Sequence, residues 1–307
     1  MKPIEDKVTY YSANSDYRGR DVVANQEIVN YHADLSLRIW FNEQTDSYPA
    51  HWHQALEIIL PVENFYDVEI NGSEYHLLPG EILIIPPGEM HMLKAPDSGK
   101  RFIFLFDMTN ISRFRGFSTI QSLMMQPIRI NKTDYTYIYD DMYRLLMQIR
   151  NEYFSEGEYR EIVIYSHLMN FFVNLGRNHL ENNHVFSGSR VYKQKEYLQK
   201  FNDILEYIDE HYMDELTLES VAASIGYSKY HFTRLFKQFT DSTFYDYLSF
   251  KRLKVAESLL AQPDLSITEI ALRSGFSSIS TFNRIFRQQK DCTPSEYRAM
   301  CKLHQQN

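Results

Sequence analysis

The last third of the chain contains the same helix-turn-helix pattern twice. In each copy, apolar residues at helical spacing lead to a glycine, and a segment reading Phe-x-Arg-x-Phe follows. The two glycines, Gly226 and Gly275, are 49 residues apart, and the two arginines, Arg234 and Arg284, are 50 apart. Two such units separated by a helix-length segment indicate a protein that reads two stretches along one face of a DNA duplex.

The first copy has the chemistry of a DNA-reading helix. Gly226 is expected to form the tight turn with a positive φ, and Ser228 to cap the helix that follows. In that helix Phe232, Leu235 and Phe236 share the inward face. A polar, basic outward face fits the major groove, which is about 12 Å wide. The residues predicted on that face are Lys229, Tyr230, His231, Thr233, Arg234 and Lys237.

The second copy repeats this arrangement after one long helix, predicted over residues 244–261. At about 1.5 Å per residue that helix spans roughly 25 Å, so the two reading helices could lie about one DNA turn apart. Gly275 is expected in the second turn, and Ser277 or Ser278 at the cap. The residues predicted on the second outward face are Ile279, Ser280, Thr281, Asn283, Arg284 and Arg287.

The charge distribution supports this assignment, although the chain as a whole is acidic, with a formal net charge of −8. Residues 226–307 contain 12 Lys/Arg and 7 Asp/Glu, a net charge of +5. The acidic residues of the C-terminal part gather in residues 196–219, before the first turn. The repeated motif is therefore basic where it would approach DNA.

Composition excludes several other classes. We find no apolar run near the roughly 18 residues that a membrane span needs, and the N-terminus lacks the apolar core of a signal peptide. The only cysteines, Cys292 and Cys301, lie near the C-terminus, which argues against a disulfide scaffold. We therefore expect a cytoplasmic protein without a membrane partner.

The first part of the chain has the pattern of a β-protein. Short apolar runs at residues 35–41, 55–60, 66–70, 81–85 and 101–106 are separated by turn residues. Asn71-Gly72 is a hairpin signal, because both residues tolerate a positive φ. Many short strands at this spacing predict a sandwich or barrel.

Helical spacing replaces strand spacing after residue 126. Residues 135–154 and 159–180 predict a helical hairpin that exposes too many apolar residues to stand alone. The expected domains are a barrel with an N-terminal arm (1–130), the hairpin (131–182), a linker (183–194) and a helical domain (195–307). In the last domain the helix-turn-helix motifs cover about 216–238 and 266–288.

Residues 200–300 resemble the DNA-binding domain of the AraC/XylS family of bacterial transcription regulators. The matching stretches begin at Leu216, Gly226, Arg252, Ile267, Gly275, Phe282 and Thr293. The resemblance implies base contacts by Tyr230, Thr233 and Arg234 in the first copy and by Ile279, Ser280, Asn283 and Arg284 in the second. It also implies a small-molecule effector, RNA polymerase as a partner, a homodimer formed through the hairpin, and activation as the sign of regulation.

The barrel half contains a second group of polar residues. His51, His53 and Glu57 have the same strand parity, and a Pro-x-Gly-x-x-His sequence ends at His91. This resembles the two cupin motifs, in which three histidines and a glutamate bind a divalent metal. We expect these four residues to hydrogen-bond within the barrel or to line an effector pocket instead, and hold metal binding as a second hypothesis. No cofactor is expected otherwise.

The fold class expected is α+β multidomain: a cupin-like β-barrel with a helical hairpin, then an all-α domain with two helix-turn-helix motifs joined by a long helix. Aromatic side chains beside polar groups suit sugar rings, so we expect a carbohydrate effector near Tyr31 and Trp40. We expect a transcription regulator and not an enzyme. Two alternatives stay open: a metal-binding cupin with an enzymatic or metal-sensing role, and a constitutive DNA-binding protein whose barrel only dimerises.

Overall fold

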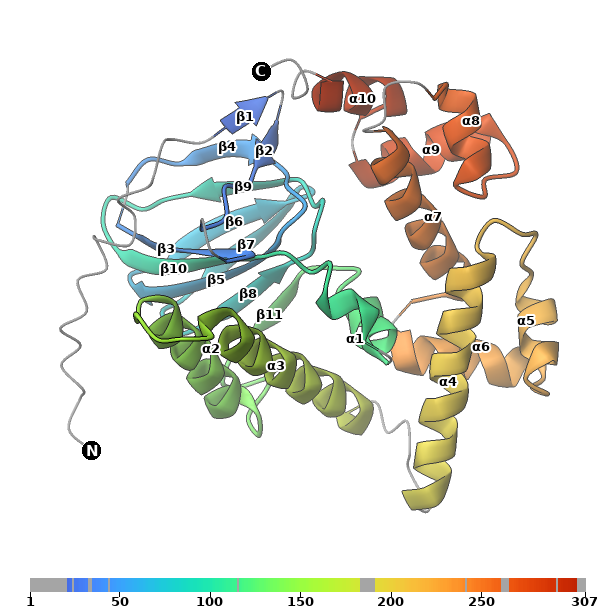
Figure 1. The fold of residues 1–307 in the computed structure, drawn as a ribbon, viewed down its shortest axis with the longest axis horizontal. Coiled ribbons are helices and arrows are strands. Elements are labelled where there is room, and N and C mark those ends of the chain that lie inside the picture. Colours follow the sequence, from blue (N-terminus) through green and yellow to red (C-terminus); the bar gives the residue numbers. More distant parts are fainter. Residues whose placement is uncertain are drawn as a thin grey trace. The chain divides into compact units, whose positions relative to one another are not determined.

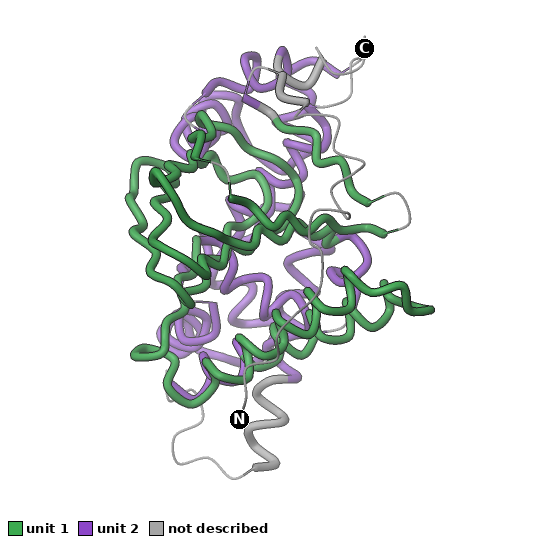
Figure 2. Tube along the Cα trace, turned by 90° about the vertical axis from the view of Figure 1, so that its left-hand side faces the viewer, with its two compact units in different colours: residues 1–22, 27–108, 127–174 green, residues 23–26, 109–126, 175–307 purple. Residues whose placement is uncertain are grey.

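A computed structural model describes most of the chain, and its contacts divide that chain into two units (Figure 2). The described residues are 21–23, 25–32, 35–43, 45–114, 116–182, 191–240, 242–260, 265–290 and 292–302. The first unit comprises residues 1–22, 27–108 and 127–174. The second comprises residues 23–26, 109–126 and 175–307. Residues 183–190 of the predicted linker (183–194) lie outside the described residues. Residues 191–194 are the start of a helix that begins at Val191.

Two antiparallel sheets, of five and four strands, form most of the first unit, and β1 and β2 form a separate pair. The strands are β1 (Asp21–Val23), β2 (Gln26–Ile28), β3 (Leu37–Asn42), β4 (Tyr48–His51), β5 (Leu56–Glu63), β6 (Tyr66–Ile70), β7 (Ser73–Leu77), β8 (Ile82–Ile85), β9 (His91–Lys94), β10 (Lys100–Phe106) and β11 (Ile128–Ile130). One sheet has the order β11-β8-β5-β10-β3, and the other β4-β9-β6-β7. β1 pairs with β2. The predicted hairpin joins β6 and β7, with φ of 47° at Asn71 and 78° at Gly72.

Strand alternation divides the five-stranded sheet into two apolar faces. The face toward the four-stranded sheet carries Ile59 and Ile103, which pack with Val68 and Leu93 of that sheet. On the opposite face lie α2 (Tyr139–Tyr153) and α3 (Arg160–Asn182), as Figure 1 shows. The Tyr165 hydroxyl on α3 donates to the carbonyls of Ser36 and Asp107 at 2.8 Å, which fixes that helix against the sheet edge. These two helices are the predicted hairpin.

The second unit is helical. Its remaining elements are η2 (Ile111–Arg113), α1 (Phe117–Leu123), α4 (Val191–His211), α5 (Leu218–Ser224), α6 (Lys229–Thr240), α7 (Phe244–Leu260), α8 (Ile267–Arg273), α9 (Ile279–Lys290) and α10 (Pro294–Lys302). The fold class predicted from the sequence, a β-domain with a helical hairpin followed by an all-α domain with two helix-turn-helix motifs, is confirmed.

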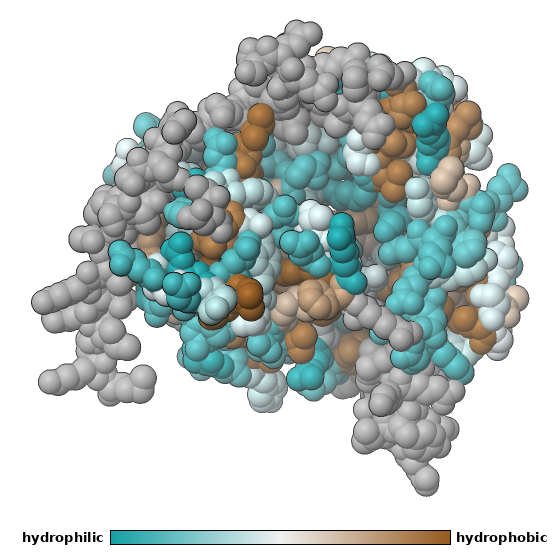
Figure 3. Space-filling view, in the orientation of Figure 1, coloured by the Kyte–Doolittle hydropathy of each residue, from teal (hydrophilic) through white to brown (hydrophobic). Residues whose placement is uncertain are grey.

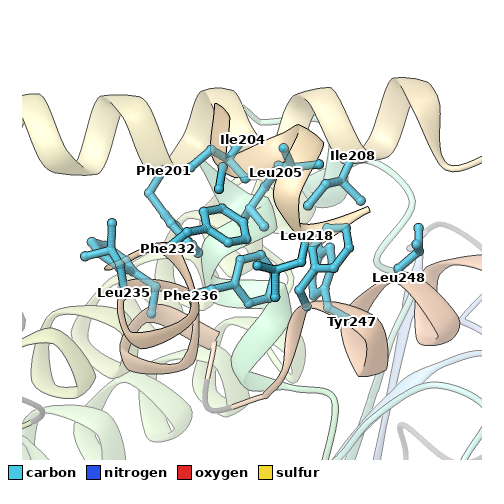
Figure 4. Close-up of a cluster of buried hydrophobic side chains, with 14 of the residues drawn as sticks. Phe201, Ile204, Leu205, Ile208, Leu218, Phe232, Leu235, Phe236, Tyr247 and Leu248 are labelled. Atoms are coloured by element: carbon cyan, nitrogen blue, oxygen red, sulfur yellow. The ribbon is translucent and has the colours of Figure 1, made fainter. Parts of the chain in front are cut away.

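One apolar cluster holds the first helix-turn-helix motif together (Figure 4). Phe201 and Ile204 of α4 point toward Phe232 and Phe236 of α6, and the rings of Phe201 and Phe236 are 5.6 Å apart. Each of these four side chains is at most 1% exposed. Fully burying a side chain of this size contributes about 1.5–3 kcal/mol, so the cluster supplies much of the stability of this half.

The segment 109–126 leaves the barrel after β10 and packs within the helical unit, which the sequence did not predict. The hydroxyl of Thr119 on α1 donates to Asn202 Oδ1 on α4 at 2.5 Å, and Ser242 donates to Met125 at 3.7 Å. α1 contacts both α4 and α6. Residues 109–126, which connect β10 to β11, therefore pack against helices of the first helix-turn-helix region.

Among the described residues, no helix is long and apolar enough to cross a membrane. The visible face of the helical unit is covered largely by hydrophilic residues, with hydrophobic side chains interspersed (Figure 3). Scattered exposed apolar side chains of this kind are normal for a protein surface.

Candidate DNA-binding surface and ligand site

The first helix-turn-helix motif is built by local polar contacts. The Thr217 side chain accepts from the Ser220 backbone N–H at 3.1 Å and begins α5 with a capping box. Gly226 has a φ of 72°, and an added Cβ there would meet nothing within 4 Å. Ser228 accepts from the His231 N–H at 3.3 Å and caps α6. The predictions for Gly226 and Ser228 are confirmed.

Helix α6 separates an apolar face from a polar one. Phe232, Leu235 and Phe236 are buried, as predicted. Tyr230 is 87% exposed, and His231 is half-buried, with its ring 4.5 Å from that of Tyr227. The other predicted outward residues are exposed: Lys229, Thr233, Arg234 and Lys237. The N-terminal half of α6 thus presents an aromatic hydroxyl, an alcohol, a guanidinium and an ammonium group on one surface.

The second motif uses the same kinds of contact, but the space around its turn glycine is more crowded. Ser266 and Glu269 form a capping box at the start of α8. Gly275 has a φ of 85°, and an added Cβ would overlap the carbonyl oxygen of Tyr212 and lie 2.9 Å from Arg252 Nε. Ser278, one of the two predicted caps, accepts from the Thr281 N–H at 3.2 Å.

Helix α9 presents a less polar surface than α6. Ile279 is 39% exposed at its N-terminus. Thr281 is half-buried and bonded to Ser278, so it contributes less to the outward face than expected. The remaining predicted residues are exposed: Ser280, Asn283, Arg284 and Arg287.

A buried ionic group connects α7 to α9. Glu257 is 4% exposed, and its Oε1 lies 3.1 Å from the ammonium nitrogen of Lys290, which is 8% exposed. Lys254 approaches the other carboxylate oxygen at 3.4 Å. Burial alone would raise the pKa of Glu257, but the two lysines outweigh it and hold the pKa below its usual value. This carboxylate is therefore ionised in the folded chain.

The predicted histidines and glutamate meet inside the barrel. His51, His53, Glu57 and His91 are 2–3% exposed. Nε2 of His53 and Nε2 of His91 lie 2.9 and 3.0 Å from the same oxygen, Oε2 of Glu57. One nitrogen from each histidine ring falls within a group no wider than 4.8 Å. The four residues meet, but not through strand parity, because His51 ends β4, Glu57 lies on β5 of the other sheet, and His53 lies between the two strands.

The ionisation of this group follows from its contacts. Burial alone would raise the pKa of Glu57, but the adjacent His91 and the hydrogen bond from His53 outweigh it and keep the pKa well below its usual range. Burial also opposes protonation of His91, yet the carboxylate of Glu57 raises the pKa of that imidazole. The site can therefore hold positive charge next to Glu57.

Glu27 also contacts the histidine group, and the sequence did not predict this contact. Its Oε2 lies 3.3 Å from His51 Nε2, and its backbone N–H donates to the Trp52 carbonyl at 2.8 Å. Glu27 is carried by β2, in a stretch that reads as polar and irregular. Nothing in its spacing relates it to His51, because the contact joins two segments that meet only after folding.

A second polar group inside the barrel was also missed. Arg101 is 2% exposed, donates to Asn42 Oδ1 at 2.9 Å and lies 4.0 Å from the ring centre of Tyr66. Arg101 has the same parity along β10 as the buried residues Ile103 and Leu105. The sequence could therefore have predicted that the Arg101 side chain points to the same face as theirs. The predicted aromatics Tyr31 and Trp40 are half-buried and pack against the inner apolar cluster.

Comparisons with known proteins agree with both halves of the chain. A family model described as an AraC-like ligand binding domain matches residues 36–171, and one described as a helix-turn-helix domain matches residues 221–300. The regulatory protein SoxS of Escherichia coli is 41% identical over 96 residues, which are 31% of this chain and 90% of SoxS. The HTH-type transcriptional regulator YijO of the same species is 29% identical over 271 residues, 86% of this chain and 89% of YijO.

Among solved structures, ToxT of Vibrio cholerae is 14% identical and gives a TM-score of 0.45 over 86% of this chain and 97% of ToxT. That score is too low for the alignment to assign any residue.

Proposed function

The chain belongs to the AraC family of transcription regulators, and we propose that it controls transcription by binding specific double-stranded DNA through α6 and α9 in response to an effector bound in the barrel. The relatives with both domains are transcriptional regulators and not enzymes. As a DNA-binding regulator it would act in the cytoplasm.

The observation that carries this proposal is the pair of exposed reading faces at the N-terminal ends of α6 and α9. Both helices are capped by a serine, Ser228 or Ser278, and both bury phenylalanines on the opposite side, three in α6 and two in α9. α7, which joins the motifs, has 17 residues and is about 25 Å long. This length suits two helices in successive major grooves, about 34 Å apart.

We propose that the first motif determines most of the sequence specificity. Tyr230, Thr233 and Arg234 can donate or accept hydrogen bonds at base edges, and Arg234 can bind a guanine with two bonds. In the second motif, Asn283 and Arg284 offer comparable contacts, whereas Ile279 can only touch a thymine methyl or another apolar group. The remaining predicted residues would contact phosphates and orient the helices.

The other finer statements are proposals that follow from the family. A homodimer would form through α2 and α3, where Tyr137, just before α2, is 94% exposed and Ile162 on α3 is 69% exposed. A dimer would bring two reading units to one operator and raise the affinity through effective concentration. Activation through contact with RNA polymerase, and a carbohydrate as effector, remain predictions from the sequence.

The test uses the full-length chain and a duplex that this chain selects from a randomised DNA pool. Arg234→Ala should weaken binding to that duplex by about 1–3 kcal/mol, or roughly 5–150-fold. The matched control is Arg129→Ala, which removes a partly exposed arginine that pairs with Glu81 in the first unit, away from the reading helices and from α2 and α3. Equal affinities of the Arg234→Ala variant and wild type would contradict the proposed reading face.

A further inference from the structure

The lysine that begins the first reading helix is paired with a glutamate of the preceding helix. Nζ of Lys229 lies 2.5 Å from Oε1 of Glu219. Glu219 is the second residue of α5, and Lys229 is the first residue of α6. We propose that Glu219 increases the discrimination between specific and non-specific DNA, because it withholds Lys229 from phosphates. This inference rests on the proposed function, since it assigns a specificity role to a residue beside the same reading face.

The contact between the two side chains is a hydrogen bond between ionised groups. The ammonium group of Lys229 donates to the carboxylate of Glu219, which holds the pKa of Glu219 below its ordinary value and raises the pKa of Lys229. Such hydrogen bonds are roughly twice as strong as those between neutral groups. A DNA phosphate must therefore compete with this carboxylate for the lysine.

The exposure of the pair points to DNA binding and not to folding. Both side chains are 56% exposed, and exposed ion pairs contribute little to the free energy of unfolding. A lysine at the first position of a helix also lies at the positive end of the helix dipole, where a cation is unfavourable. In a helix-turn-helix motif the first helix crosses the DNA backbone and the N-terminal residues of the second face the bases. The pair therefore lies at the DNA in the proposed complex.

Glu219 is an acidic exception in a basic motif. α5 and α6 together contain one acidic residue, Glu219, against two lysines and one arginine. The matching positions of the second motif carry no charge, because they are Thr268, second in α8, and Ile279, first in α9. The ion pair is therefore confined to the motif for which we propose most of the sequence specificity.

The distances between the charges determine how the pair affects DNA binding. A phosphate bound by Lys229 at about 2.8 Å would lie within roughly 6 Å of the Glu219 carboxylate. This separation is shorter than the Debye length of about 8 Å at physiological salt, so the two negative charges would repel one another. In water, two like charges about 6 Å apart reduce a binding constant about 3-fold.

This penalty falls unequally on the two kinds of complex. Non-specific binding consists almost entirely of phosphate contacts, so it loses most when a lysine is withheld. In the specific complex, base contacts by Tyr230 and Arg234 would fix the position of α6, so Lys229 could not shift toward a phosphate. Glu219 therefore weakens non-specific binding more than specific binding.

The experiment uses the full-length chain, the selected duplex and a duplex of the same length and composition with a scrambled sequence. Glu219→Gln should raise the affinity for the scrambled duplex about 3-fold and the affinity for the selected duplex by less. On the scrambled duplex, the plot of log affinity against log salt should steepen by about 0.9, the value for one further released counterion. A role in folding alone would change the melting temperature but not this slope.

A double-mutant cycle with Lys229→Met tests whether Glu219 acts through the lysine. In the Lys229→Met background, Glu219→Gln should no longer steepen the salt dependence. A full effect in that background would overturn the role of the ion pair, because Glu219 would then repel phosphates directly. The matched control is Glu74→Gln, which makes the same change of charge at an exposed glutamate that pairs with Lys94 in the barrel. This control should leave both affinities and the salt dependence unchanged.

Three further results with Glu219→Gln would overturn the inference. Unchanged affinities and salt dependence would show that Lys229 is not withheld from phosphates. Equal gains on the two duplexes would exclude a role in discrimination. Loss of preference at a single base pair would make Glu219 a base contact, since glutamate can accept a hydrogen bond from cytosine. A wild-type chain that binds both duplexes equally refutes the proposed function itself.

Discussion

The two turn glycines provide a matched pair of substitutions, because both have a positive φ but only one is crowded. At Gly226 an added Cβ would meet nothing within 4 Å, so Gly226→Ala tests the backbone conformation alone. At Gly275 the same Cβ would overlap the Tyr212 carbonyl and lie 2.9 Å from the Met213 Cα. Gly275→Ala therefore adds a steric clash with backbone atoms that cannot rotate away.

The expected magnitudes follow from these environments. A non-glycine residue in the left-handed region costs about 1–2 kcal/mol, which is the whole effect at Gly226. Overpacking at Gly275 adds about 1–3 kcal/mol, for a total of roughly 2–5 kcal/mol. With a urea m-value of about 2 kcal/mol per molar, Gly275→Ala should lower the midpoint of the affected unit by at least about 1 M.

The assay can separate the two units of the chain. Both tryptophans, Trp40 and Trp52, belong to the first unit, so tryptophan fluorescence follows the barrel. Circular dichroism at 222 nm follows mainly the helical unit. Gly275→Ala should shift the circular dichroism transition and leave the fluorescence transition unchanged. Equal shifts for the two glycine variants would refute the steric argument, and a fluorescence shift alone would refute the assignment of Gly275 to the helical unit.

Two further predictions concern the buried pair between α7 and α9. Glu257→Gln leaves the ammonium group of Lys290 buried without its carboxylate partner, so the free energy of unfolding in urea should fall by about 3 kcal/mol. The double variant Glu257→Gln/Lys290→Met should recover most of this lost stability. If the double variant recovers none of it, the loss of the ion pair is not the cause. The pKa of Glu257 is lower in the folded chain than in the unfolded one, so its stabilisation is complete above the ordinary value near 4.5 and is lost as the pH falls below it. Circular dichroism melting should show that loss in the wild type and a flatter acid profile in the double variant; parallel profiles would contradict the assignment.

The sequence predicted best those features that depend on neighbouring residues. The turn at Gly275 and the cap by Ser278 each require only a few consecutive residues of the right type, and the structure has both. The histidine cluster was predictable only from the resemblance to the cupin motifs, because His51 ends β4 and His53 lies beyond that strand, so their parity along the chain does not define one face.

Features that depend on tertiary contacts were missed. Helix α1 is short and rich in serine and threonine, and Thr119 is held by Asn202, 83 residues away. Glu27 meets His51 only because β2 returns to the barrel. Spacing along the chain carries no information about such pairs.

The unequal glycines also show how the two reading helices are kept at a fixed separation. Arg252 on α7 donates to the Tyr212 carbonyl at 2.8 Å and to the Asp214 carbonyl at 2.9 Å, directly beside Gly275. The second turn is thereby packed onto the chain segment that ends α4, whose side chains form the core under α6. The first turn has no such neighbour at Gly226. Without the contact between Gly275 and Tyr212, α7 would be the main connection between the two motifs. The spacing of α6 and α9 therefore depends on residues that do not contact DNA in the proposed function.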